Sequence, residues 1–184
     1  MQYLLPSLRL WAVTLLVCVA GYTALVLGFA QSVVPDRANG SIIMAQGKPI
    51  GSALVAQDFT SPRYIWPRPS AADYNGMGAA GSNLSPTSPK LAARAAEAVA
   101  RYGAKPANPV PADLVAASGG GLDPHISLAG ALYQAKRVAQ ARGLSDASVR
   151  ALIERHAFAP GGAFAPDPIV NVLELNLALG RLER

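Results

Sequence analysis

The chain has almost none of the residues from which protein metal centres are built. Its 184 residues include one cysteine, Cys18, and two histidines, His125 and His156, which lie far apart in the sequence. Zinc sites need several such ligands at short, regular spacings. The sequence therefore predicts no metal site. Because Cys18 lies within an apolar run, the rest of the chain can form no internal disulfide.

Dense positive charge is also missing. After the first 9 residues there are 15 basic and 11 acidic residues, and Lys136-Arg137 is the only adjacent basic pair. A nucleic-acid-binding protein normally concentrates its basic residues on one face or along one helix. We therefore expect no nucleic acid among the partners of this chain.

A catalytic constellation is missing as well. Nucleophilic catalysis requires a nucleophile, a base within hydrogen-bond reach and an acid that orients the base. Ser118, His125 and several aspartates are present, but these residue types are common and no Gly-x-Ser-x-Gly motif occurs. We therefore predict no catalytic residue, and a hydrolase is disfavoured.

Charge is absent altogether from residues 10–30. An α-helix of that length is about 31 Å long, close to the ~30 Å hydrocarbon core of a bilayer. We predict a transmembrane helix over residues 10–30, preceded by residues 1–9 and followed by one soluble domain, residues 31–184. The alternative is a cleaved signal peptide, since Gly28-Phe29-Ala30 offers a small-x-small site. Signal peptides, however, have apolar runs of only about 7–15 residues.

The charges beside this span favour one orientation. Arg9 and the α-amine precede the span, whereas Asp36 and Arg37 cancel on its other side, although acidic residues count little in the positive-inside rule. We expect residues 1–9 to lie in the cytoplasm and the soluble domain to be extracytoplasmic.

One face of the predicted span carries small residues. Ala20, Ala24 and Gly28 recur every four residues and so share a helix face. Small residues allow another membrane helix to approach closely, where van der Waals packing drives association. Alanine and glycine are also simply common in membrane helices, so the sequence leaves a docking face and ordinary composition both open.

The soluble part begins with strand-like and irregular segments. Residues 41–44 and 50–57 are short apolar runs bounded by Gly and Pro, which predicts strands. A long stretch rich in Pro and Gly follows and contains Tyr64, Trp66 and Tyr74. Disordered linkers are poor in aromatic residues, so we expect an ordered irregular loop that lies on a core or a partner.

Apolar stripes at helical spacing, bounded by capping residues, predict three further helices. They run over residues 89–102, 124–142 and 146–157. Asp123 and Ser145 are expected to cap the second and third of these. The C-terminal leucine run alternates like a strand and also fits a helix, and its Leu and Ala content favours a helix. The predicted fold class is α/β: one N-terminal transmembrane helix and a single soluble mixed α/β domain with few short strands.

The most distinctive motif is the glycine-rich run at residues 118–125 (SGGGLDPH). A glycine-rich turn before a helix can present backbone N–H groups to an anion. A phosphate-binding P-loop, however, has Gly-Lys-Ser/Thr after the turn, where this chain has Asp-Pro-His. We interpret the run as a turn that leads into a capped helix.

Several segments together resemble the small C subunit of the Kdp potassium-transporting ATPase. They are residues 51–59 (GSALVAQDF), 64–71 (YIWPRPSA), 74–75 (YN), 81–84 (GSNL), 113–115 (DLV), 117–127 (ASGGGLDPHIS) and 170–176 (VNVLELN). The likeness covers nearly the full chain. Pro67, Gly120 and Leu128 depart from the family, which usually has Gly, Ser and Pro there. Gly120 therefore excludes a hydroxyl role at that position.

The resemblance implies an accessory subunit of an ATP-driven potassium uptake complex in the bacterial inner membrane, not an enzyme. It implies two protein partners besides the lipid bilayer: a potassium-channel-like subunit and an ATP-hydrolysing P-type subunit. The family is described as a catalytic chaperone that supports assembly and raises the ATP affinity of the hydrolytic subunit. We expect no directly bound cofactor, because an extracytoplasmic domain cannot touch cytoplasmic ATP. ATP and potassium would then act through the complex.

The candidate contacts to a partner or ligand are mostly polar or aromatic side chains within the resembling segments. They are Gln57, Trp66, Arg68, Tyr74, Asn75, Ser82, Asn83, Ser118, Asp123, His125, Asn171 and Asn176. Tyr74, Asn75, Ser82 and Asn83 would serve equally well to stabilise turns through side-chain-to-backbone hydrogen bonds. The rival function is a stand-alone, membrane-anchored binding protein or hydrolase of the cell envelope.

Overall fold

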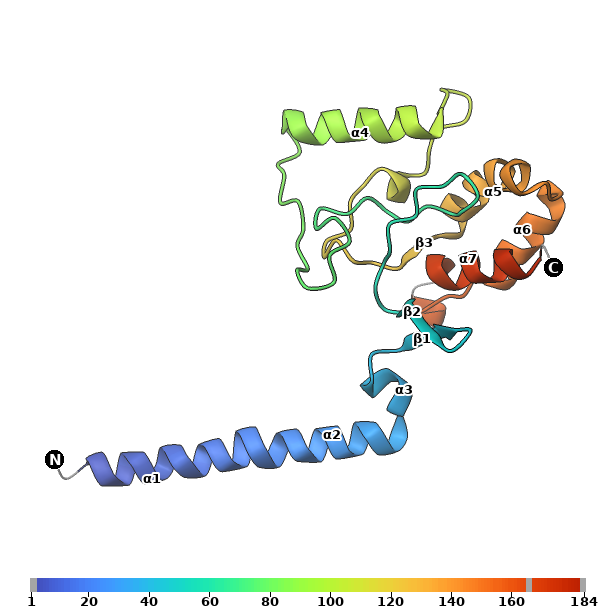
Figure 1. Ribbon diagram of the computed structural model, residues 1–184. Coiled ribbons are helices and arrows are strands. Elements are labelled where there is room, and N and C mark those ends of the chain that lie inside the picture. Colours follow the sequence, from blue (N-terminus) through green and yellow to red (C-terminus); the bar gives the residue numbers. More distant parts are fainter. Residues whose placement is uncertain (1–2, 165–166, 183–184) are drawn as a thin grey trace. The chain divides into compact units, whose positions relative to one another are not determined.

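The computed structural model describes residues 3–164 and 167–182. The chain divides into two compact units, Met1–Ile50 and Gly51–Arg184. The first unit contains the apolar helix and a β-hairpin, and the second contains a helical core around two short strands (Figure 1). Each unit is described by itself below.

The first unit is dominated by a continuous apolar helix, Leu4–Val33. It consists of α1 (Leu4–Leu15), a π-helical segment (Leu16–Gly21) and α2 (Tyr22–Val33). Its 30 residues are long and apolar enough to cross a membrane. At about 1.5 Å per residue the helix measures roughly 45 Å, which matches a bilayer including its headgroup regions. The observed helix extends beyond the predicted span, residues 10–30, at both ends.

A short turn and a hairpin follow this helix. The helix α3 (Pro35–Ala38) is held to the end of α2 by the Gln31 and Asn39 side chains, whose amides exchange hydrogen bonds of 3.1 and 3.2 Å. The strands β1 (Ile42–Ala45) and β2 (Lys48–Ser52) form a two-stranded sheet. Gln46 and Gly47 join them with φ of 51° and 74°, which suits a tight hairpin turn.

The predicted strand over residues 50–57 is wrong in its extent. Strand β2 ends at Ser52 because a turn closes immediately after it. The Ser52 carbonyl accepts a hydrogen bond from the Val55 N–H at 3.3 Å, and the Ser52 hydroxyl accepts one from the Leu54 N–H at 3.0 Å. The prediction extends past this turn because it rests on the apolar residues alone.

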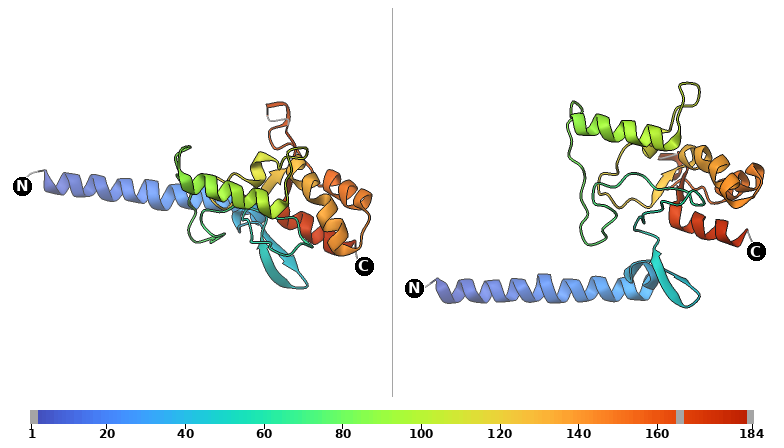
Figure 2. Two further views of the ribbon diagram at one scale, coloured as in Figure 1. Left: turned by 90° about the horizontal axis from the view of Figure 1, so that it is seen from above. Right: turned by 45° about the horizontal axis from the view of Figure 1, so that its top comes forward.

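The core of the second unit surrounds an antiparallel strand pair, β3 (His125–Ser127) and β4 (Ile169–Asn171), in which Ile126 lies opposite Val170. The helices α5 (Leu128–Arg142), α6 (Asp146–Arg155) and α7 (Val172–Arg181) gather beside these strands (Figures 1 and 2). Together these elements bury an apolar cluster. It includes Ile65, Leu114, Ile126, Val138, Val149, Ile153, Val170, Leu175 and Leu179.

The helix predicted over residues 124–142 begins in the structure at Leu128, four residues later than predicted. Residues 125–127 pair with β4, and Ser127, not Asp123, caps α5 by accepting a hydrogen bond from the Gly130 N–H at 2.8 Å. His125 is therefore on a strand and not at the second position of a helix. A three-residue strand is too short to show a period-two pattern, so its distant pairing was invisible in the sequence.

The other helix predictions are confirmed, except that the helix predicted over residues 146–157 ends at Arg155, two residues early. Ser145 caps α6 by accepting from the Ser148 N–H at 3.0 Å, and the C-terminal leucine run is the helix α7. The helix α4 (Pro89–Tyr102) has the predicted bounds and ends at Gly103, which adopts the left-handed conformation with φ of 60°. The structure describes every residue of α4, and none of them is fully buried. Two 3-10 turns, Ala112–Leu114 and Gly162–Phe164, complete the described elements.

Candidate partner-binding site

The segment Ile65–Trp66 runs through the interior and is held by two side-chain amides. Asn176, on α7, accepts from the Ile65 N–H at 2.8 Å and donates to the Ile65 carbonyl at 2.9 Å. Gln134, on α5, accepts from the Trp66 N–H at 2.8 Å and donates to the Trp66 carbonyl at 3.1 Å. Both amides thus pair with the backbone as a neighbouring strand would. Asn176 is 4% exposed and Gln134 is 1% exposed.

The Trp66 ring is the centre of a cationic and aromatic stack. The guanidinium carbons of Arg137 and Arg101 lie 3.6 and 4.0 Å from the ring centroid, and the Tyr102 ring centroid lies 5.4 Å away. Cation–π attraction and ring packing therefore attach α4 to α5 across this tryptophan. Burial lowers the pKa of Arg137 to about 10, so this side chain keeps its charge at neutral pH.

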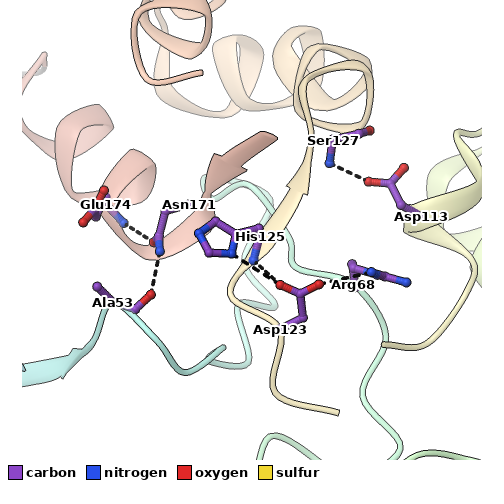
Figure 3. Close-up of polar contacts among 8 residues, drawn as sticks. All are labelled: Ala53, Arg68, Asp113, Asp123, His125, Ser127, Asn171 and Glu174. Carbon is purple, nitrogen blue, oxygen red and sulfur yellow. Dashed lines mark hydrogen bonds and ion pairs between the residues drawn. The ribbon is translucent and has the colours of Figure 1, made fainter. Parts of the chain in front are cut away.

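Asp123 joins two basic side chains at the start of β3 (Figure 3). Its carboxylate lies 3.1 Å from an Arg68 nitrogen and 3.4 Å from His125 Nδ1, and it also accepts from the His125 N–H at 3.0 Å. The hydrogen bond from the His125 side chain is the main cause that lowers the pKa of Asp123, and burial opposes it. These contacts fix the backbone at the entrance to the strand.

Two further polar side chains in Figure 3 also bind the backbone. Asn171 donates to the Ala53 carbonyl at 2.8 Å and caps α7 by accepting from the Glu174 N–H at 3.1 Å. Asp113 accepts from the Ser127 N–H at 2.7 Å, next to the N-terminus of α5. Asn171 was a candidate in the sequence, whereas Asp113 and Gln134 were missed. Gln134 could have been found because it shares a helix face with the apolar Ala131 and Val138.

The glycine-rich run is a turn, as predicted, but it leads into the strand β3 and not into a capped helix, and it supports the preceding loop. Ser118 is buried, and its N–H donates to the Pro69 carbonyl at 3.2 Å. The Gly120 carbonyl accepts from the Ala80 N–H at 3.0 Å. A Cβ atom added to Gly121, whose φ is +71°, would lie 2.7 Å from the Ala80 carbonyl oxygen. The two loops therefore approach so closely that only glycine fits.

The remaining candidates lie nearer the surface. Tyr74 is half-buried and donates from its hydroxyl to the Arg68 carbonyl at 2.8 Å, whereas Asn75 and Asn83 are exposed. Ser82 and Gln57 are half-buried. The structure thus brings Arg68, Asp123 and His125 together. That any of these candidates meets a partner or ligand stays a prediction, and so does the membrane-helix face of Ala20, Ala24 and Gly28.

An apolar groove of about 660 Å³ lies beside α4 in the second unit. Leu91 and Val99 of α4 line it together with Val110 and Val115 of the segment that follows, and Lys105 is the charged residue among those that line it. A groove of this composition does not suit a phosphate chain or a bare cation. Among residues 3–164 and 167–182, no group of three His, Cys, Asp or Glu side chains could hold a metal ion.

Comparison with known proteins gives one consistent result. The family model "K+-transporting ATPase, c chain", called KdpC, matches residues 4–181. A potassium-transporting ATPase KdpC subunit of Parvibaculum lavamentivorans is 65% identical over 184 residues, which cover 100% of this chain and 98% of that relative. Proteins of the same name from Cereibacter sphaeroides and Serratia proteamaculans are 49% and 46% identical. These two matches cover 97% and 100% of this chain, and the same shares of the relatives.

Proposed function

The chain belongs to the KdpC family of potassium-transporting ATPase subunits, and from this premise we propose that it is a non-catalytic accessory subunit that supports the assembly and activity of its complex. Its partners in this proposal are the potassium-channel-like subunit and the ATP-hydrolysing subunit. The single membrane helix anchors it beside them, and its domain acts on the extracytoplasmic side.

The non-catalytic part of the proposal rests on what the polar side chains bind. Asn176, Asn171 and Asp123 all bind backbone groups of the domain itself. A catalytic side chain instead aims at a space where substrate can sit. Together with the apolar character of the groove beside α4, this supports a domain built to hold a fixed surface and not to perform chemistry.

The orientation determines how the subunit can influence ATP use. If the domain is extracytoplasmic, it is separated by the bilayer from the site of ATP hydrolysis. Any increase in ATP affinity would then be an indirect effect, carried by the spanning helix or by the assembled complex. By linkage, a domain contact that raises ATP affinity must be stronger in the state of the complex that binds ATP better.

A truncated chain tests the contribution of the domain. The whole complex would be prepared with the full chain, and in parallel with a chain that lacks residues 36–184 but keeps the membrane helix. We expect the truncated form to lose most of the potassium-stimulated ATPase activity at limiting ATP. Full activity at every ATP concentration would rule the domain out as a contributor.

A single accessible cysteine tests the orientation. Cys18 is the only cysteine, so Cys18→Ala followed by Ala147→Cys places one thiol at an exposed position of α6. We expect a membrane-impermeant maleimide to label this thiol in spheroplasts without lysis. Labelling only after lysis would place the domain in the cytoplasm.

The rival function, a stand-alone envelope protein, requires instead that the full chain purifies in mild detergent without larger subunits.

A further inference from the structure

The loop at residues 74–83, here called the Met77 loop, has a strained backbone. Tyr74 has φ of 55° and Asn83 has φ of 49°, and Asp73, directly before the loop, also has φ of 49°. A bulky residue such as tyrosine rarely adopts a positive φ. Strain of this kind persists only where surrounding contacts over-determine the backbone, and it is concentrated at functional sites.

Contacts at both ends hold the Met77 loop in this conformation. The Ser70 hydroxyl donates to the Gly121 carbonyl at 2.6 Å and accepts from the Tyr74 N–H at 3.0 Å. At the far end, the Ala80 N–H donates to the Gly120 carbonyl at 3.0 Å. The loop is therefore anchored on the glycine-rich run before and after its tip.

The tip of the loop presents one large apolar side chain to solvent. Met77 is 96% exposed and lies between Gly76 and Gly78. Its N–H donates to the Asn75 side chain at 3.0 Å, and the Gly78 N–H donates to the Asn75 carbonyl at 3.0 Å. The methionine thus projects from a hydrogen-bonded turn and not from a slack segment.

Met77 lies in a segment of the sequence that contains no charged residue. Residues 75–89 contain no Asp, Glu, Lys or Arg, although 15% of the chain is charged. The cores of protein–protein interfaces are depleted of charge and enriched in methionine. A loop that is already ordered also loses little conformational freedom on binding.

We propose that Met77 is an anchor residue that inserts into an apolar pocket on another protein subunit of the potassium-transporting complex. This inference rests on the proposed function and specifies the surface through which the domain docks. A protein pocket fits better than a lipid surface. One apolar side chain without neighbouring basic residues cannot hold a domain on a membrane, which requires a larger apolar area or attraction to anionic headgroups.

The test uses the full chain, tagged and coexpressed with the other subunits, with the complex purified in mild detergent. The half-life of the complex after dilution is compared for wild type, Met77→Asp and Met77→Leu. We expect Met77→Asp to dissociate about tenfold faster, because it would bury an unpaired carboxylate. Met77→Leu should remain within about twofold of wild type, because it conserves volume. The matched control is Met44→Asp, since Met44 is a second exposed methionine at 56%.

Each outcome has a distinct meaning. A wild-type chain that retains no larger subunit refutes the proposed function and this inference with it. A wild-type complex that Met77→Asp leaves unchanged refutes the inference alone, as does an equal loss in Met77→Leu or Met44→Asp. A photoreactive amino acid at position 77 should crosslink to a larger subunit, and crosslinks to lipid alone would also overturn the inference.

Discussion

The amide pair between Asn176 and Ile65 offers the sharpest test of how this domain is held together. In Asn176→Leu both hydrogen bonds to Ile65 are lost, while the number and branching of the side-chain heavy atoms are kept. Ile65 is 0% exposed, so its N–H and carbonyl would be left without water or protein partners. An unpaired buried backbone group costs about 1–3 kcal/mol, so the two together should lower the free energy of unfolding by about 3 kcal/mol.

This loss should be visible in thermal unfolding of the full chain in mild detergent. For a protein of this size a loss of 1 kcal/mol lowers the Tm by about 2–4 °C, so we expect a decrease of roughly 6–12 °C. Asn108→Leu is the control, because Asn108 is exposed and pairs with Lys105 through its backbone, which the substitution keeps. A surface substitution of this kind should change stability by less than about 0.5 kcal/mol. A Tm for Asn176→Leu within about 1 °C of wild type would refute this account of the segment.

A double mutant extends the test to the neighbouring clamp. Gln134 binds the backbone of Trp66 in the same way, one residue along the segment. If the two amides hold one segment as a unit, the losses of unfolding free energy in Asn176→Leu and Gln134→Leu should not add in the double mutant. Loss of either amide would already release part of the backbone that the other amide holds. Strict additivity would mean that each amide fixes only its own backbone partner.

Acid, base and denaturant titrations test three other features of the domain. The pKa of Asp123 is lowered, so its contribution to stability should be complete above about pH 4 and should fall as the pH drops through the folded-state pKa; Asp123→Asn should flatten acid unfolding curves in this range. Burial raises the pKa of Tyr74 and of Tyr102 to about 12, so an absorbance titration should show phenolate signals near pH 12 that Tyr74→Phe and Tyr102→Phe each reduce, and no such signal in that range would contradict this. Gly121→Ala should destabilise the chain by about 2 kcal/mol or more in chemical denaturation, because an alanine there has positive φ and meets a backbone oxygen, whereas Gly119→Ala, which meets nothing within 4 Å, should be nearly neutral.

The sequence predicts best those elements whose signals are local. The bounds of α4 were predicted correctly because Pro89 and Gly103 mark its two ends, and the cap of α6 was predicted from Ser145. The start of α5 was predicted wrongly, because residues 125–127 form a strand whose partner is more than 40 residues away. Pairing of that kind has no local signature when each strand contributes only three residues.

The residues of the candidate site fall into two groups, those that attract attention in the sequence and those that only the structure reveals. Polar side chains such as Asn171 and Asn176 attract attention in a sequence, yet in the structure they lie inside the domain and bind its own backbone. Met77 attracts none, because an apolar residue in a loop looks ordinary until its exposure is known. The polar residues hold the loops, and the glycine-rich run supports the loop that carries Met77. This distinctive motif would then act indirectly, because it fixes the shape of a surface to which it contributes no side chain.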